Sequence, residues 1–581
     1  MKVKLSDYVM TFLETKNTKH VFTISGGGCM HLIDSLGKSN IEYICNHHEQ
    51  ALAMAVEGYA RMEKGVGVGL VTTGPGGTNT ITGLVGCWLD SIPAIFISGQ
   101  VPTSQLSEGT GCRQIGDQEF DIVDMVKNIT KYAVTVKNKN DIKYCLEKAF
   151  YKMKEGRQGP VWIDIPLDIQ ASTIDTNSLK IFVPPRKHKK HYTDLEYVVK
   201  KIENSKKPLF VVGNGVRLSG ARKTLLNLLK KTQIPVVTGP HSGVDIVNES
   251  YENYAGRIGV LGHRSSNKII QECDLMIAIG TRLGYKMTGY KQGSFAKNAY
   301  KILVDVDENE MNKENIEADL KIKSDAKIFL EKLNKHQYKN INIFKWIDKC
   351  RGLRKQETYV FKKHRDLKNY ASNYCFVEGL SKLVPENIPT VTSNGSAHVI
   401  TLQTMKLKGD QRLFTNVGCA SMGYGLPAAI GACFANERKP IVCIEGDGSI
   451  QMNIQELQTI IHHKLPIKMF VINNDAYLSI KATQDNYFNS NYVGTNTESG
   501  VSLPDLKKIS NAYGISYENI KNNNEIDEKI QKVLDHNDGP IICEVYTYPK
   551  EKHEPKVVAK IKEDGTFEPG ELTNMHISET F

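Results

Sequence analysis

The stretch GDGSIQMNIQELQTIIHHKLPIKMFVINN, residues 446–474, decides the fold. Its hydrophobic pattern predicts that one strand ends at the first glycine, that a turn and a helix follow, and that a second strand occupies 467–474. Strand, helix and strand within about thirty residues is the length of one βαβ unit. The stretch therefore predicts an α/β domain built on a parallel sheet.

The same alternation of strand and helix patterns continues along the rest of the chain. Short β-branched apolar runs end in glycine or a polar residue and lead into amphipathic helical patterns, which is typical of parallel α/β domains. Further runs that we expect to be strands lie at 41–45, 67–74, 156–166, 208–215, 274–280, 300–307 and 440–446. We predict three doubly wound parallel-sheet domains, at 1–180, 192–335 and 365–548, and a polar C-terminal tail at 549–581. A chain of 581 residues suits three domains.

Composition narrows the class of protein. No apolar run reaches the roughly 18 residues of a membrane-spanning helix, and the N-terminal residues 1–16 contain no apolar signal-peptide core, so we expect a cytoplasmic location. The net charge is +10, but the main basic cluster, 186–191, follows two prolines and is best interpreted as a solvated linker. We predict no nucleic-acid or membrane partner. The twelve cysteines form no CxxC pair, so neither a zinc site nor a disulfide framework is indicated.

Two polar residues follow neighbouring strands of the predicted unit. Asp447 lies just past the carboxyl end of one strand and Asn474 just past the end of the other. Parallel strands bring these ends to one edge of the sheet, about 4.8 Å apart. Carboxylate and amide oxygens suit Mg²⁺, which leaves other positions for phosphate and water, and the helix that follows offers N–H groups to a diphosphate. The alternative for GDG alone is an ordinary turn with a capping aspartate; the paired Asn473 and Asn474 favour the metal site.

The glycine–aspartate–glycine motif followed by two asparagines resembles the signature of thiamine-diphosphate enzymes. That resemblance implies that Asp447, Asn474 and the backbone carbonyl of Ala476 hold the metal. The segment CNHHEQALAMAVEGYAR (45–61) is similar to the family's N-terminal active-site motif, in which Glu49 bonds the aminopyrimidine ring and starts a proton relay. By itself, Glu49 is an acidic residue in a first helical turn, a common partner of the helix dipole.

Further segments extend the resemblance from end to end. They are VFTISGGGCMHLIDSL (21–36), VTTGPGGTNTITGL (71–84), DSIPAIFISGQVPTS (90–104), DQEFDIV (117–123), GPVWIDIPLDIQ (159–170) and VGCASMGYGLPAAIGA (417–432). Together they make the chain similar to the acetolactate (acetohydroxyacid) synthase large-subunit group. The resemblance implies a thiamine-diphosphate-dependent decarboxylase and carboligase that takes a 2-keto acid, with pyruvate the first choice, and joins its two-carbon unit to a carbonyl acceptor.

The resemblance also implies roles for individual residues. The catalytic set is Glu49, Gly27, Gly28 and Gln118. The cofactor-binding set is Glu49, Gly26, Thr73, Pro75, Asn79, Ser396, Ala397, His398, Ala420, Met422, Gly446, Asp447, Gly448, Ser449, Asn474, Ala476, Tyr477 and Leu478. Met422 would prop the cofactor, although a plain core methionine is an equally ordinary reading. His48 either only caps the helix or serves as a proton shuttle.

Several positions depart from the family pattern. Thr483 stands where the family has a tryptophan that shapes the acceptor pocket, and the segment 106–116 is added beside Gln118. The segment 474–484 is similar to a subgroup of surface-polysaccharide pathways that adds two-carbon units to a keto-sugar nucleotide. The resemblance also suggests FAD in the middle domain: Arg282 is kept, but the acidic pair after it is absent. GNGVRLSG (213–220) is not a GxGxxG fingerprint, so a structural turn is at least as good an interpretation.

Other functions remain open at this point. They are a non-ligating 2-keto acid decarboxylase, a hydrolase that cleaves a diketone, a non-catalytic cofactor-binding paralogue and, opposed by the missing glycine fingerprint, a nicotinamide dehydrogenase. The family resemblance further implies a homodimer or homotetramer with active sites at the subunit interface.

Overall fold

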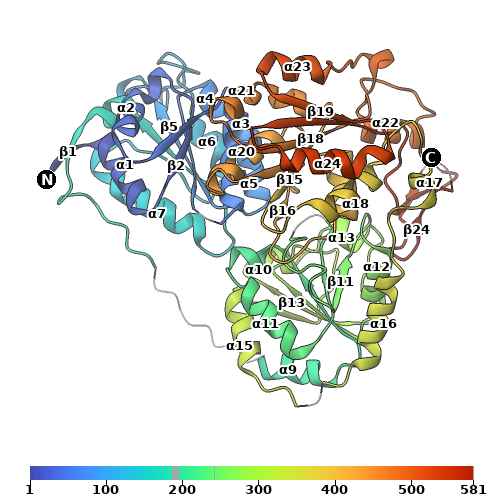
Figure 1. The fold of residues 1–581 in the computed structure, drawn as a ribbon. Coiled ribbons are helices and arrows are strands. Elements are labelled where there is room, and N and C mark those ends of the chain that lie inside the picture. The colour runs from blue at the N-terminus through green and yellow to red at the C-terminus, as the bar shows by residue number, and fades with distance from the viewer. Residues whose placement is uncertain (64, 186–194, 241–242, 340, 565, 580–581) are drawn as a thin grey trace.

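The computed structural model describes residues 1–579 except 64, 186–194, 241–242, 340 and 565. Three lobes share the chain (Figure 1): the first domain lies at the upper left, the third at the upper right and the central one below them. Each lobe contains a six-stranded parallel sheet flanked by helices. The predicted fold class, three doubly wound α/β domains, is confirmed. The basic cluster 186–191, interpreted as a linker, lies outside the described residues.

The first domain has the strand order β3-β2-β4-β5-β7-β6. Its strands are β2 (His20–Thr23), β3 (Glu42–Cys45), β4 (Gly67–Val71), β5 (Ala94–Gln100), β6 (Ala133–Thr135) and β7 (Val161–Pro166). The helices that cover them include α1 (Leu5–Thr15), α2 (Met30–Lys38), α3 (Glu49–Arg61), α4 (Pro75–Thr78), α5 (Ile81–Leu89), α6 (Ile122–Val126) and α7 (Ile142–Lys154). A separate antiparallel pair joins β1 (Lys2–Lys4) to β8 (Thr173–Asp175).

The third domain repeats that order as β16-β15-β17-β18-β20-β19. Its strands are β15 (Thr390–Thr392), β16 (Leu413–Phe414), β17 (Ile441–Gly446), β18 (Ile467–Asn473), β19 (Ser516–Ile520) and β20 (Ile541–Tyr546). Its helices include α17 (Lys362–Arg365), α18 (Asn373–Leu383), α19 (Ser396–Thr404), α20 (Gly425–Ala435), α21 (Leu457–His462), α22 (Leu478–Tyr487), α23 (Leu506–Tyr513) and α24 (Ile526–Asp535), with the 3-10 helix η5 (Ile450–Glu456). Counted along each domain, both sheets run second, first, third, fourth, sixth, fifth.

The central domain has a different strand order, β11-β10-β9-β12-β13-β14. From β9, successive strands are added first on one side of the sheet, to β11, and then on the other side, from β12 to β14, so the strand order reverses between β9 and β12. Its strands are β9 (Pro208–Val212), β10 (Val236–Thr238), β11 (Tyr254–Arg257), β12 (Leu275–Ile279), β13 (Tyr300–Asp305) and β14 (Leu320–Lys323). Its helices include α9 (Leu195–Asn204), α10 (Gly215–Leu218), α11 (Arg222–Thr232), α12 (Arg264–Glu272), α13 (Tyr285–Thr288), α15 (Ala326–Lys335) and α16 (Phe344–Lys355). In α16, Trp346 is buried and donates from Nε1 to the carbonyl of Pro208 over 3.0 Å.

Small residues join the first and third domains. Helices α3 and α20 pack so closely that a Cβ on Gly58 would lie 2.2 Å from the Ala428 carbonyl oxygen. A Cβ on Gly431 would lie 1.9 Å from the carbonyl oxygen of Ala55. Only glycine permits backbones to approach this closely, so these two domains share one continuous apolar core.

The C-terminal tail connects the third and central domains. Leu572 is buried among the apolar side chains of the central core, and the amide of Val557 donates to the carbonyl of Val260 over 2.9 Å. In Figure 1 the chain ends beside α17 and β24 (Met575–His576). The tail is therefore packed structure and not merely a surface covering.

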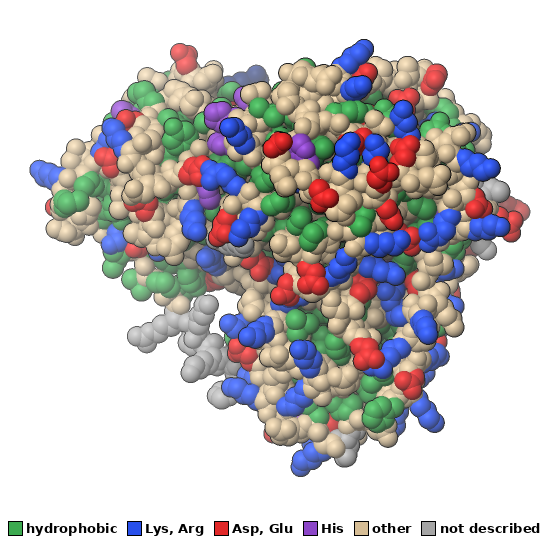
Figure 2. All heavy atoms as spheres, viewed as in Figure 1, with side chains coloured by type: hydrophobic (Ala, Val, Ile, Leu, Met, Phe, Trp, Pro, Cys, Tyr) green, Lys and Arg blue, Asp and Glu red, His purple; other side chains and the backbone are tan. Residues whose placement is uncertain are grey.

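The surface carries both signs of charge. Figure 2 shows lysine and arginine interspersed with aspartate and glutamate over the face in view, with no large area of a single sign. Among the described residues, no helix is both long and apolar enough to cross a bilayer.

Candidate active site

Asp447 ties together the loops that follow β17 and β18. Its Oδ2 accepts the backbone N–H of Asn474 over 2.9 Å and that of Asp475 over 2.8 Å, while Oδ1 accepts the N–H of Gly448 over 2.8 Å. The residue is only 4% exposed, and this burial raises the pKa of the carboxyl to about 7. The two strand ends therefore meet at one sheet edge, as the sequence pattern predicts.

Asn474 presents an unsatisfied oxygen at that edge. The residue is 6% exposed, and its Oδ1 has no hydrogen-bond partner among the described residues. A buried acceptor without a partner costs roughly 1–3 kcal/mol, so its presence fits a site that a ligand completes. The Asp447 carboxylate lies at the neighbouring strand end, and the buried Ala476 follows Asn474 by two residues, so these residues offer the hard oxygen donors that suit Mg²⁺.

The loop after β15 belongs to the same site. Ser393 Oγ lies 2.7 Å from Ser449 Oγ, and the Gly423 amide donates to Ser449 Oγ over 2.8 Å. Helix α19 begins at Ser396 after Gly395, whose φ of 69° requires glycine. Asn394 Nδ2 donates to the carbonyl of Ala420. The loops after β15 and β17 are therefore joined through Ser393 and Ser449 and form one wall of the candidate site.

The predicted diphosphate residues surround this wall. Gly448 must be glycine because a Cβ there would lie 2.2 Å from the Tyr477 ring. The first turn of α19 and the start of α22 direct backbone N–H groups toward the edge, the arrangement that binds anions at helix N-termini. Buried members are Ser396, Ala397, His398, Asp447, Gly448, Ser449, Asn474, Ala476 and Leu478; half-buried members are Ala420, Met422, Gly446 and Tyr477. The structure brings this whole subset together.

Glu49 occupies a comparable edge of the first domain. It is the first residue of α3, and Asn79 Nδ2 donates to its Oε2 over 2.9 Å. His48 caps the same helix, because its Nδ1 accepts the Gln50 amide over 3.0 Å. His48 therefore caps the helix, and a role as a proton shuttle stays a prediction. Asn79 therefore orients the carboxylate that the family resemblance assigns to proton transfer.

The glycine turn after β2 lies beside the turn after β4. The Gly28 amide donates to Thr72 Oγ1 over 3.1 Å, and a Cβ on Gly26 would lie 2.5 Å from the Thr72 Cβ. Gly27 is exposed, with nothing within 4 Å of a Cβ built there. Backbone atoms that no side chain covers therefore line this part of the sheet edge.

The remaining first-domain residues surround that turn. Thr73 is buried, and its hydroxyl donates to Gln100 Oε1 over 2.8 Å, which fixes the turn. Pro75 is exposed at the first position of α4. Gln118 is exposed, with a left-handed φ of 60°, and its carbonyl lies 2.7 Å from a Cβ built on Gly74. Its backbone is therefore fixed while its side chain faces solvent.

The two groups of residues are not brought together within one chain. In Figure 1, α4 beside Glu49 and α22 after Asn474 lie at opposite ends of the third-domain sheet. Glu456 Oε2 accepts from Asn46 Nδ2 over 2.9 Å and Oε1 accepts the His47 amide over 2.8 Å, so the segment before Glu49 is held by the third domain away from the Asp447 edge. Glu456 was not predicted, since a glutamate in mid-segment has no distinctive pattern.

A cavity of about 390 Å³ occupies the point where strand order reverses in the central domain. Its lining includes the turns after β9 and β12 and Asp305 at the end of β13, whose burial raises its pKa to about 6. A Cβ on Gly213 would lie 2.5 Å from the Gly280 carbonyl oxygen. The GNG turn therefore has a packing role as well as lining a cavity typical of ligand sites in open α/β sheets.

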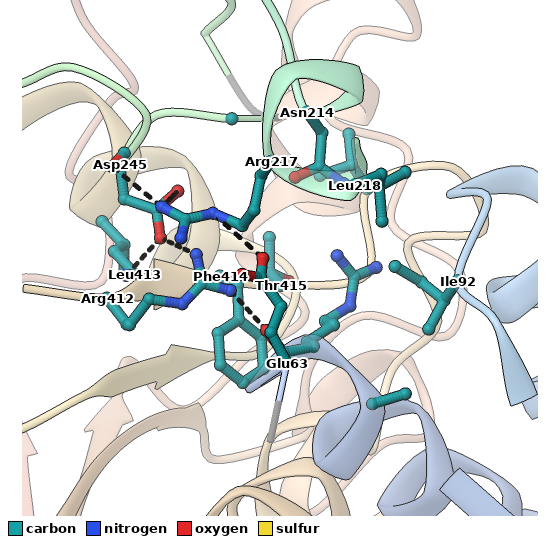
Figure 3. Close-up of a pocket in the computed structure, with 14 residues that line it drawn as sticks. Glu63, Ile92, Asn214, Arg217, Leu218, Asp245, Arg412, Leu413, Phe414 and Thr415 are labelled. Carbon is teal, nitrogen blue, oxygen red and sulfur yellow. Dashed lines mark hydrogen bonds and ion pairs between the residues drawn. The ribbon is translucent and has the colours of Figure 1, made fainter. Parts of the chain in front are cut away.

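A much smaller cavity of about 30 Å³ lies where the three domains meet (Figure 3). Arg217 from the central domain and Arg412 from the third domain both contact Asp245, over 3.3 and 2.5 Å. Arg217 Nε also lies 3.6 Å from Glu63 of the first domain. Opposite charges satisfy one another here, and the space suits about one water molecule, so this network joins domains.

Comparison with known proteins defines the class first. Residues 3–125, 195–333 and 393–545 match the family models described as the thiamine pyrophosphate enzyme N-terminal TPP binding domain, central domain and C-terminal TPP binding domain. One match falls on each of the three sheets, although the first ends before β6 and β7 and the third begins just after β15. The chain is a thiamine-diphosphate-dependent enzyme.

Individual relatives define the family. "Acetolactate synthase isozyme 2 large subunit" of Escherichia coli (strain K12) is 32% identical over 540 residues, covering 93% of this chain and 95% of its own length. "Acetolactate synthase large subunit" of Cyanidium caldarium is 33% identical over 559 residues, covering 92% of each chain. "Probable acetolactate synthase large subunit" of Methanococcus aeolicus is 30% identical over 549 residues, covering 90% and 88%. The chain belongs to the acetolactate synthase large-subunit family.

Proposed function

We propose that this enzyme decarboxylates a 2-keto acid, with pyruvate the first choice, and joins the resulting two-carbon unit to a carbonyl acceptor. The observation that carries the proposal is the buried, unpaired Asn474 Oδ1 beside the buried Asp447 carboxylate. A buried oxygen without a partner, next to a buried carboxylate at a sheet edge, favours a site that a ligand completes. Thiamine diphosphate, when bound, supplies the electron sink for breaking the carbon–carbon bond.

Different residues of the chain would bind the metal, bind the diphosphate and transfer the proton. Asp447, Asn474 and the Ala476 carbonyl would hold Mg²⁺, and the first turn of α19 would donate N–H groups to the diphosphate. Glu49 would hold and transfer a proton at its carboxylate, in the orientation set by Asn79 at 2.9 Å. The open backbone at Gly26, Gly27 and Gly28 would let the reacting carbon approach.

A second copy of the chain would complete the site. Because the Glu49 edge and the Asp447 edge lie apart within one chain, a partner must bring its own Asp447 edge to this Glu49. Exposed apolar side chains surround both edges, Met30, Ile115 and Phe120 on the first domain and Met452, Ile480 and Phe488 on the third. Exposed apolar groups of this kind are typical of protein interfaces. We propose a homodimer or a dimer of dimers.

The acceptor is proposed to be bulkier than a simple 2-keto acid. Thr483 is exposed, and its hydroxyl is already used by the carbonyl of Ser479 over 3.1 Å. A short side chain at this position leaves room where the family has a tryptophan. A keto sugar is the class that fits the resemblance of segment 474–484.

A flavin is proposed for the central cavity. Its position at the reversal of strand order favours a dinucleotide, and Arg282 lines it, 3.4 Å from Glu310. Absorbance near 450 nm that is released by acid from purified protein would support FAD, and its absence after flavin supplementation would overturn this part of the proposal alone.

The main test is a product analysis. Purified protein with thiamine diphosphate, Mg²⁺ and ¹³C-pyruvate, with and without carbonyl acceptors, should release CO2 and form a new carbon–carbon bond visible by NMR. Acetaldehyde as the sole product would instead favour a non-ligating decarboxylase. Consumption of a cyclic diketone but not of pyruvate would favour a hydrolase, and no bound thiamine diphosphate would overturn catalysis altogether.

A further inference from the structure

The C-terminal tail reaches the wall of the candidate active site through one histidine. His553 Nε2 lies 3.0 Å from Ser396 Oγ, and Ser396 is the first residue of α19. This contact joins the polar tail predicted at 549–581 to a residue 157 positions earlier in the chain. A side chain from the tail therefore touches the helix start at which a diphosphate would bind.

Two buried glutamates fix the backbone on either side of His553. Glu551 is 2% exposed, and its Oε2 accepts the Asn373 amide over 2.9 Å. The Glu554 amide donates to Tyr374 Oη over 2.6 Å, and Lys363 Nζ lies 2.8 Å from Glu554 Oε2. Burying two carboxylates is costly unless they are bonded in this way. The imidazole is thus presented in a defined position.

The surroundings of His553 favour an anion. Burial lowers the pKa of His398 to about 3, and the positive charge of Lys286 acts in the same direction, so a lysine lies close to the first turn of α19. The Ser396 wall is joined through Ser393 and Ser449 to the loop of Asp447. Asn474, in the loop that Asp447 binds, has a buried Oδ1 without a partner among the described residues, which independently indicates a ligand position.

We propose that His553 is a positioning residue for the diphosphate, acting through Ser396; this inference rests on the proposed function. Burial lowers the pKa of His553 to about 4, so its ring is neutral near pH 7. In the Nε2–H tautomer, which the inference assigns to His553, donation to Ser396 Oγ occupies one lone pair and leaves the serine hydrogen free to point at a phosphate oxygen. Without His553, the hydroxyl rotates freely and loses that orientation.

The test is binding, measured by titration calorimetry on the full chain with Mg²⁺. Replacement His553→Leu should weaken thiamine diphosphate about 10- to 100-fold, the effect of losing one oriented hydrogen bond to a charged group. Thiamine, which has no diphosphate, should change by less than about twofold. His553→Gln, whose Nε2 donates from a similar place, should restore most of the affinity. Equal losses for both ligands would overturn the inference, because they would indicate a general defect.

Two further variants make the result specific. Lys552→Ala, at an exposed neighbouring position, should bind like the wild type, and thermal midpoints should show that every variant is folded. In the Ser396→Ala background, His553→Leu should have no further effect if it acts through the hydroxyl; an additive loss would overturn that route. If the wild type itself binds no thiamine diphosphate, the proposed function fails. If wild type and His553→Leu bind equally, only this inference fails.

Discussion

The first and third domains share one strand order but present different chemistry at equivalent strand ends. The third strand leads to Thr72 and Thr73 in the first domain and to Asp447 in the third domain. The fourth strand leads to Val101 in one and to Asn474 in the other. One edge therefore offers open backbone and a single oriented carboxylate, Glu49, while the other offers a set of oxygen ligands. The topology supplies the edge, and the side chains placed there decide what it binds.

The largest expected effect separates proton transfer from binding. Glu49→Gln preserves size and the contact with Asn79 but removes the ionisable group, so turnover should fall by about 10²–10⁴. Affinity for thiamine diphosphate should stay within about threefold, since the proposed diphosphate site is at the other edge. Steady-state rates and calorimetry measure the two. Asp124→Asn, an exposed acid in the first turn of α6, is the control; wild-type turnover in Glu49→Gln would contradict the proton-transfer role.

The next effect tests the metal edge. Asn474→Ala removes the unpaired oxygen, so thiamine diphosphate affinity in Mg²⁺ should fall by about 100-fold. The thermal midpoint should not fall, because no existing side-chain hydrogen bond of that oxygen is lost. Asp447→Ala should lose both affinity and stability, since three backbone N–H groups would lose their acceptor. Asp475→Asn is the neighbouring control. A clear loss of stability in Asn474→Ala would show that its oxygen serves the fold.

A third effect tests the packing that joins the two domains. Gly431→Ala places a Cβ 1.9 Å from the Ala55 carbonyl oxygen and should lower the free energy of unfolding by about 1–3 kcal/mol. Gly352→Ala is the matched control, because a Cβ there meets nothing within 4 Å and the residue lies inside α16. That variant should be neutral or gain about 0.5–1 kcal/mol. Urea unfolding measures both, and equal stability of the two variants would contradict the close approach.

The smallest effect concerns a buried acid on the sixth strand of the first domain. Asp164 accepts from Ser98 Oγ over 2.6 Å, and burial raises its pKa to about 7. The folded carboxyl keeps its proton at pH values where the unfolded one, with a pKa of about 3.9, has lost it. Its contribution to stability is therefore full below about pH 4 and declines as pH rises to 7.

Replacing Asp164 should reduce the loss of unfolding free energy as the pH rises. Between pH 6 and 7, the wild type should lose about 1 kcal/mol of unfolding free energy that Asp164→Asn keeps. Fluorescence of Trp162, whose Nε1 donates to Ser98 Oγ over 2.8 Å, follows the transition. The exposed Asp538→Asn should behave like the wild type. A pH profile unchanged by Asp164→Asn would contradict the raised pKa.

Much of the fold and of the metal edge could be predicted because both depend on local patterns. The strand at 467–474 and the glycines around Asp447 indicate a βαβ unit, and parallel strands bring their ends together whatever the rest of the chain does. Glu456, Asn79 and His553 could be assigned their contacts only from the structure. Their partners lie 410, 30 and 157 positions away in the chain, and no spacing within a segment encodes such distances.

By itself, the sequence determined the three parallel sheets, the family and the side-chain types at each edge, because periodicity, glycine placement and side-chain chemistry are local properties. Only the tertiary structure decided that the Glu49 and Asp447 edges lie apart in one chain, that the tail contacts Ser396, and that the Asn474 oxygen has no partner in the part of the chain that is described. Those facts depend on how closely α3 and α20 pack and on where buried groups find partners, which is settled by the whole molecule at once.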